Sequence, residues 1–170
     1  MDHFARLGMP AALDLEAAEV DRAYFARQRQ WHPDRFVARP PEEKAKASAE
    51  AAALNDAYRT LKDPLSRAVY LASLKGVELP GDGKTIDDPE LLMEAMEARE
   101  ALHEADTIEA VEALAGKARH DMQEALSGLT GLFLRDDGPA LRKALLRLRY
   151  LDKFVEETRA RRANLERAKA

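Results

Sequence analysis

The chain contains no cysteine. It therefore forms no disulfide, offers no thiol nucleophile and holds no zinc, haem or iron–sulfur centre through thiolates of its own. Aromatic residues make up only 6% of the 170 positions, with 8 Gly and 8 Pro, a composition that disfavours a β-sandwich or barrel. Because 46% of the residues are hydrophobic and 34% charged, we expect a soluble all-α protein with a packed core.

Long apolar runs are also absent. No stretch approaches the roughly 18 apolar residues of a membrane-spanning helix, and the opening MDHFARLGMP lacks a basic segment followed by an apolar one. We therefore expect a cytoplasmic protein with no membrane partner. His3, His103 and His120 lie far apart and form no metal-ligand spacing, so no metal and no other cofactor is expected.

The net charge of −4 hides an uneven distribution. Residues 77–126 hold 14 Asp or Glu against 4 Lys or Arg, a net charge of −10, whereas residues 127–170 hold 6 against 11, a net charge of +5. This pattern predicts that the two segments attract each other within one bundle and that surplus acid is left for a partner. Nucleic acid is not expected as a partner, because its binding requires a basic face.

Glycine and proline mark the expected boundaries. Residues 76–89, GVELPGDGKTIDDP, hold three glycines and two prolines, and we place a linker at residues 77–88 between domains at 1–76 and 89–170. The expected helices cover residues 2–7, 15–31, 42–61, 65–75, 89–104, a segment that ends near residue 127, and a long last segment that begins near residue 139.

Capping patterns support the downstream helices. Asp88 followed by Pro89 predicts one helix start, and Asp106 with Glu109 predicts the next. Gly128 and Gly131 are expected to end this helix near residue 127 and to be followed by a less regular backbone. The last helix carries an apolar stripe at three- and four-residue steps, Leu141, Leu145, Leu148, Leu151 and Val155.

The tripeptide His32-Pro33-Asp34 lies in the loop between the second and third expected helices. Pro33 fixes one backbone angle, and Asp34 offers a short carboxylate suited to a bidentate arginine contact. One alternative is an ordinary turn, since these residue types are common in turns. Another is a catalytic His32–Asp34 pair in a small hydrolase, although no accompanying nucleophile constellation is evident.

The flanks of this tripeptide narrow the interpretation. The segments that carry a resemblance to a known family are QRQWHPDRF, NDAYRTLKDPLSRAVYL and the opening DHFARLGMP. The chain resembles the HscB family over essentially all of its length. The members of this family are J-type co-chaperones of bacterial iron–sulfur cluster assembly. The resemblance implies an N-terminal J-domain, an antiparallel helical hairpin with short helices, and a C-terminal three-helix bundle that binds the client. It implies no enzymatic activity.

The resemblance also assigns roles. His32, Pro33 and Asp34 would contact an HscA-type, DnaK-like chaperone and trigger its ATP hydrolysis. Arg22 and Arg29, with Arg35 in the loop, are the best candidates for further basic contacts, although a solvated face explains them equally well. Arg27 departs from the general J-domain pattern, because it stands where leucine is usual, and its aliphatic stem is expected to cover the core.

The expected helix at residues 89–104 has two apolar sides. At roughly 100° per residue, one stripe gathers the core candidates Leu91, Ala95, Ala98 and Leu102. Another side combines apolar and acidic side chains, namely Leu92, Met93, Met96, Glu97, Glu100 and Glu104. Small domains seldom expose such a patch without a use. The alternative is a wide core face with a solvated acidic rim.

In the HscB family, the corresponding surface binds the iron–sulfur scaffold protein IscU. The resemblance therefore implies scaffold binding by Leu92, Met93, Met96, Glu97, Glu100 and Glu104, joined by Tyr150 at a position where phenylalanine is common. A J-domain co-chaperone that serves a different client is the main alternative function.

Overall fold

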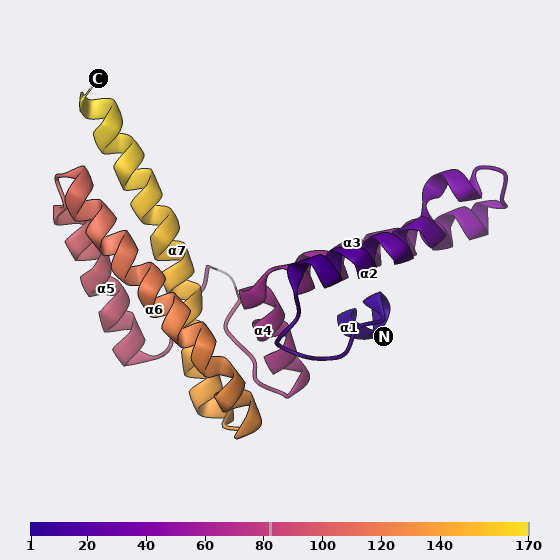
Figure 1. Cartoon of the computed structure of the whole chain (residues 1–170), viewed down its shortest axis with the longest axis horizontal. Coiled ribbons are helices and arrows are strands. Elements are labelled where there is room, and N and C mark those ends of the chain that lie inside the picture. The colour runs from indigo at the N-terminus through magenta and orange to yellow at the C-terminus, as the bar shows by residue number, and fades with distance from the viewer. Residues whose placement is uncertain (82, 170) are drawn as a thin grey trace. The chain divides into compact units, whose positions relative to one another are not determined.

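The structure is a computed structural model that describes residues 1–81 and 83–169. These residues form α-helices and one short 3-10 helix, and no strand occurs among them (Figure 1). The chain divides into two compact units, Met1–Leu74 and Lys75–Ala170, and each is described by itself. The expected all-α fold class is confirmed.

The first unit is built around a helical hairpin. It comprises α1 (His3–Leu7), α2 (Ala17–Trp31), the 3-10 helix η1 (Pro33–Phe36), α3 (Pro41–Lys62) and α4 (Pro64–Leu74). The α2 and α3 helices lie side by side and antiparallel (Figure 1). Val20 of α2 and Leu54 and Leu61 of α3 are buried in the core, and the Tyr24 hydroxyl donates to Asn55 Oδ1 at 2.6 Å. This packing holds the loop between the two helices in place.

Arg27 lies over the end of α1. Gly8 caps this helix in the left-handed conformation, with φ of 71°, which favours glycine because it lacks a Cβ. A Cβ atom at Gly8 would lie only 2.6 Å from Nη2 of Arg27. The exposed Arg27 thus approaches the α1 cap with its guanidinium.

The second unit is a bundle of three helices, α5 (Pro89–Glu104), α6 (Ile108–Leu134) and α7 (Gly138–Lys169) (Figure 1). The Asp88 side chain accepts from the Leu91 amide at 3.1 Å, which confirms the expected start of α5. The apolar stripes expected on α5 and α7 face the core, because their residues are buried or partly buried within it. Among the described residues, α7 contributes more buried side chains than α5 or α6, including Leu145, Leu148 and Phe154.

Two local expectations about α6 are wrong. Thr107, and not Asp106, is the N-cap, since its hydroxyl accepts from the Ala110 amide at 3.1 Å. The helix also continues through Gly128 and Gly131 to Leu134. A glycine inside a helix costs about 1 kcal/mol, whereas full burial of a leucine side chain such as Leu129 contributes about 1.5–3 kcal/mol. Packing of α6 along α7 therefore outweighs the low helix propensity of the two glycines.

The basic last helix pairs with the acidic segment, as the charge distribution predicts. Arg142 binds Asp87 through two guanidinium nitrogens at 3.0 and 2.7 Å. Further pairs along α7 are Lys143–Glu90, Arg147–Glu94 and Arg162–Glu112. Within the described residues, none of the helices is both long and apolar enough to span a membrane.

Leu145→Ala tests the core of the second unit. Because Leu145 is 0% exposed, we expect this substitution to lower the free energy of unfolding by about 2–5 kcal/mol. Urea denaturation followed by circular dichroism measures the change. Leu134→Ala is the matched control, since this leucine is 81% exposed, and it should change the stability by no more than about 0.5 kcal/mol. Equal effects of the two substitutions would contradict the packing described for α7.

Candidate functional site

The His32-Pro33-Asp34 loop has a defined local geometry. His32 adopts an extended backbone with φ of −61° and ψ of 132°, because a residue before proline is disfavoured in the helical conformation. Its ring Nδ1 accepts from the Asp34 amide at 3.3 Å. A neutral imidazole whose Nδ1 accepts carries its proton on Nε2, so His32 keeps a donor for a partner. The Asp34 carboxylate is exposed.

Contacts around the tripeptide brace the loop. The Arg35 guanidinium donates to the Arg29 carbonyl at 3.1 Å, and the Arg35 amide donates to the His32 carbonyl at 3.0 Å. The rings of Trp31 and Phe36 stack with centroids 6.0 Å apart and planes 5° apart. These two aromatic residues flank the tripeptide in the sequence, and that position is the signal that could have identified them as loop supports.

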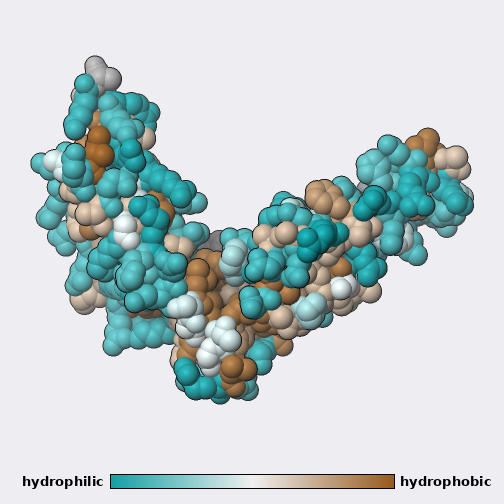
Figure 2. Space-filling model, viewed as in Figure 1, coloured by the Kyte–Doolittle hydropathy of each residue, from teal (hydrophilic) through white to brown (hydrophobic). Residues whose placement is uncertain are grey.

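The three candidate arginines are exposed but not equivalent. Arg22 and Arg29 lie two turns apart on α2. Arg35 is engaged by the Arg29 carbonyl and therefore also braces the loop. Figure 2 shows hydrophobic surface at the end of the hairpin, where Val37 is exposed. The end of the hairpin thus combines polar, basic and apolar groups.

The outer face of α5 carries exposed apolar side chains. Met93 is 62% and Met96 61% exposed, which excludes a core position for both, while Leu92 is partly buried. Glu97, Glu100 and Glu104 are exposed on the same face. Among the residues that the structure describes, these three carboxylates make no ion pair, in contrast to Glu90 and Glu94 on the same helix. We call these six residues the α5 outer face.

Tyr150 lies beneath this face and contributes little surface of its own, since it is only 7% exposed. Its ring borders two hollows. One, of about 250 Å³, is also lined by Glu97 and Ala98, and the other, of about 300 Å³, by Leu92 and Arg99. Burial, together with a hydrogen bond to Glu94, raises the pKa of the Tyr150 hydroxyl above its ordinary value, so this hydroxyl stays protonated at neutral pH.

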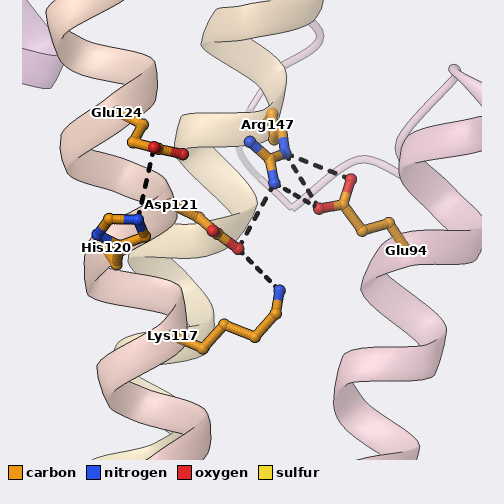
Figure 3. A network of polar contacts seen from close by, with 6 residues as sticks. All are labelled: Glu94, Lys117, His120, Asp121, Glu124 and Arg147. Carbon is orange, nitrogen blue, oxygen red and sulfur yellow. Dashed lines mark hydrogen bonds and ion pairs between the residues drawn. The ribbon is translucent and has the colours of Figure 1, made fainter.

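A polar network joins the three helices of the bundle next to Tyr150. Figure 3 shows Arg147 of α7 reaching Glu94 of α5 and Asp121 of α6, with Nη2 at 2.9 Å and 3.6 Å from the two carboxylates. Lys117 also donates to Asp121 at 3.0 Å. Partial burial acts to raise the pKa of Glu94, but hydrogen bonds from Arg147 and Tyr150 outweigh it and hold this pKa below its ordinary value of 4.5.

Sequence reasoning missed Glu94 and Arg147 as positioning residues. Their opposite charges lie 53 positions apart, and no local signal pairs them, although the acidic and basic character of the two segments was visible. In the described ranges, 1–81 and 83–169, no group of three or more His, Cys, Asp or Glu side chains is arranged to hold a metal ion.

The fold and the loop define the class of the protein. A helical hairpin with His32-Pro33-Asp34 in its connecting loop, followed by a separate helical bundle, is the arrangement of a J-domain co-chaperone. Residues 2–70 match the DnaJ domain, and residues 87–159 match the family described as the HSCB C-terminal oligomerisation domain. The chain belongs to the HscB family.

Relatives and solved structures agree along the chain. The co-chaperone protein HscB homolog of Aeromonas hydrophila is 36% identical over 161 residues, which cover 92% of this chain and 94% of the relative. The structure of chaperone HscB from Vibrio cholerae has a TM-score of 0.85 at 32% identity, covering 97% of this chain and 99% of that one. Human co-chaperone protein HscB has a TM-score of 0.85 at 29% identity, with 94% and 81% covered.

Glu94→Gln tests the network under the α5 outer face. A carboxyl whose folded pKa is lowered stabilises the fold above its unfolded pKa, and this contribution is lost as the pH falls through the folded pKa. We expect Glu94→Gln to cost on the order of 1 kcal/mol or less at pH 7, since the pair is partly exposed. The cost should shrink towards pH 3, and urea unfolding at both pH values measures it.

Glu124→Gln is the matched control for this substitution. Within the part of the chain that the structure describes, the ion-pair partner of Glu124 is His120, at 3.5 Å, and both side chains are exposed. This variant should therefore unfold like the unchanged protein at both pH values. A cost of Glu94→Gln that stays constant between pH 7 and pH 3 would show that the charge of Glu94 does not matter.

Proposed function

We propose that this chain binds the iron–sulfur scaffold protein IscU on the α5 outer face and delivers it to an HscA-type, DnaK-like chaperone. In this proposal, the His32-Pro33-Asp34 loop stimulates the chaperone's ATPase. The observation that carries the proposal is the presence, on one HscB-family chain, of a braced J-domain loop and a separate helix face with exposed methionines and unpaired carboxylates.

The chaperone contact is argued from the loop. His32 offers a donor, Asp34 offers an exposed carboxylate, and Pro33 holds their backbone in one conformation. An arginine on the chaperone would bind the Asp34 carboxylate with two parallel hydrogen bonds. Because Arg35 and the Trp31–Phe36 stack already order the loop, docking costs little conformational entropy.

The scaffold contact is argued from the α5 outer face. Leu92, Met93 and Met96 form an apolar centre, and burial of such a centre supplies most of the affinity of an interface. The unpaired Glu97, Glu100 and Glu104 would orient a partner with basic groups and raise its association rate. Tyr150, lying under α5, supports the centre from below and borders the two hollows beside it.

The two contacts on one chain would couple the partners. A scaffold bound to the second unit is held at high local concentration for a chaperone that docks on the first. Coupling of this kind predicts that the scaffold and this protein together stimulate the chaperone's ATPase more than their separate effects combined.

His32→Gln is expected to abolish stimulation of the HscA-type chaperone's ATPase and to leave IscU binding unchanged. His32 is exposed, and its ring nitrogen contacts the neighbouring Asp34, so the fold should survive. Steady-state ATP hydrolysis with and without IscU and isothermal titration calorimetry against IscU are the two measurements. His120→Gln, at an exposed position on α6, is the control and should retain both activities. Full stimulation by His32→Gln would refute the role of the loop.

The triple substitution of Leu92, Met93 and Met96 by alanine is expected to do the reverse. Loss of the apolar centre should weaken IscU binding at least about tenfold, or about 1.4 kcal/mol, because these side chains carry the affinity. Stimulation of the chaperone in the absence of IscU should persist. The exposed Leu134→Ala is the control for surface leucine removal. If the unchanged protein stimulates the chaperone but does not bind IscU in calorimetry, the client is a different protein.

A further inference from the structure

Two exposed sulfur atoms of this protein lie on the same helix face. The chain has five methionines and no cysteine. Apart from the N-terminal Met1, only Met93 and Met96 are exposed, at 62% and 61%. Met9 is partly buried in the first unit, and Met122 packs against the core of the second. Two of the three exposed thioethers, those of Met93 and Met96, therefore lie three residues apart on the α5 outer face.

We propose that Met93 and Met96 form an oxidation-sensitive modification site, at which conversion to the sulfoxide releases the partner that docks on the α5 outer face. This inference rests on the proposed function, because it concerns the same surface. The reagent is a hydroperoxide such as hydrogen peroxide. No thiol of this chain competes for it, since cysteine is absent.

The reaction is a two-electron oxidation of sulfur at each methionine. The thioether sulfur attacks one peroxide oxygen, the O–O bond breaks, and an S–O bond forms. The departing hydroxide takes up the proton of the transferred hydroxyl and leaves as water. The products are one methionine sulfoxide and one water per peroxide, and methionine sulfoxide reductases reverse the change.

The product is unsuited to the docking surface. A sulfoxide is polar and adds a hydrogen-bond acceptor where the proposed contact is apolar. Glu97 and Glu100, exposed on the same face, are also acceptors, so they offer the sulfoxide no donor. Burying this oxygen in the apolar centre of the contact would leave it unsatisfied, which is costly.

Oxidation would separate the two activities of the chain. The loop segment at residues 31–40, WHPDRFVARP, contains no sulfur. Of the two methionines in the first unit, Met9 is partly buried, and the exposed Met1 lies outside this loop. The α5 outer face would thus lose its partner while the chaperone contact stays intact. The chaperone's ATPase would then no longer be coupled to client binding.

The test treats the full-length chain with hydrogen peroxide and follows each methionine by peptide mass spectrometry. Because reactivity follows exposure, Met93 and Met96 should gain oxygen about fivefold faster than Met9 and Met122. Calorimetry against IscU should then show affinity reduced about tenfold or more, since the buried sulfoxides lack partners. Methionine sulfoxide reductases should restore the affinity, and ATPase stimulation without IscU should not change.

Two variants serve as controls. Met93→Leu/Met96→Leu should have the same IscU affinity before and after peroxide treatment, whatever its starting value. Met9→Leu/Met122→Leu should remain as sensitive as the unchanged chain. IscU binding that survives complete oxidation of Met93 and Met96 overturns this inference alone, as does equal reactivity of the four methionines. If the untreated chain does not bind IscU, the proposed function fails and this inference falls with it.

Discussion

The packing of α5 against α7 determines which side of α5 faces solvent. Leu91, Ala95 and Leu102 are buried in the same core as Leu151 and Phe154 of α7, so the opposite side of the helix has to remain outside. Ion pairs from α7 engage the flank of α5 through Glu90 and Glu94. The same interactions that hold the bundle together thus engage those two glutamates, whereas the glutamates of the outer face form no ion pair with any residue that the structure describes.

The two proposed contact surfaces differ in their physical design. The loop on the first unit is small and polar, and it is kept in one conformation by proline, a ring stack and backbone hydrogen bonds. Such a site suits a contact that depends on direction, as hydrogen bonds and arginine–carboxylate pairs do. The α5 outer face relies instead on flexible thioether side chains, which adapt to an apolar partner surface. Each surface lies within its own compact unit.

The use of methionine has two consequences on this helix. An unbranched thioether fits irregular surfaces and makes a tolerant contact, but its sulfur is also the atom most open to two-electron oxidation in a chain without cysteine. Leucine at the same positions would keep the apolar area without the redox sensitivity. The exposure of Met93 and Met96 therefore links the adaptability of the face to its proposed vulnerability.

Local signals in the sequence determined much of this protein. Asp88 with Pro89 predicts the start of α5, Pro33 predicts the break after α2, and the leucine spacing of α7 predicts its core face, because each depends on neighbours within a few residues. Only tertiary structure decided that α6 continues through Gly128, that Tyr150 lies beneath α5, and that Arg147 binds Glu94. These outcomes depend on packing between segments distant in the chain, where burial outweighs local preference.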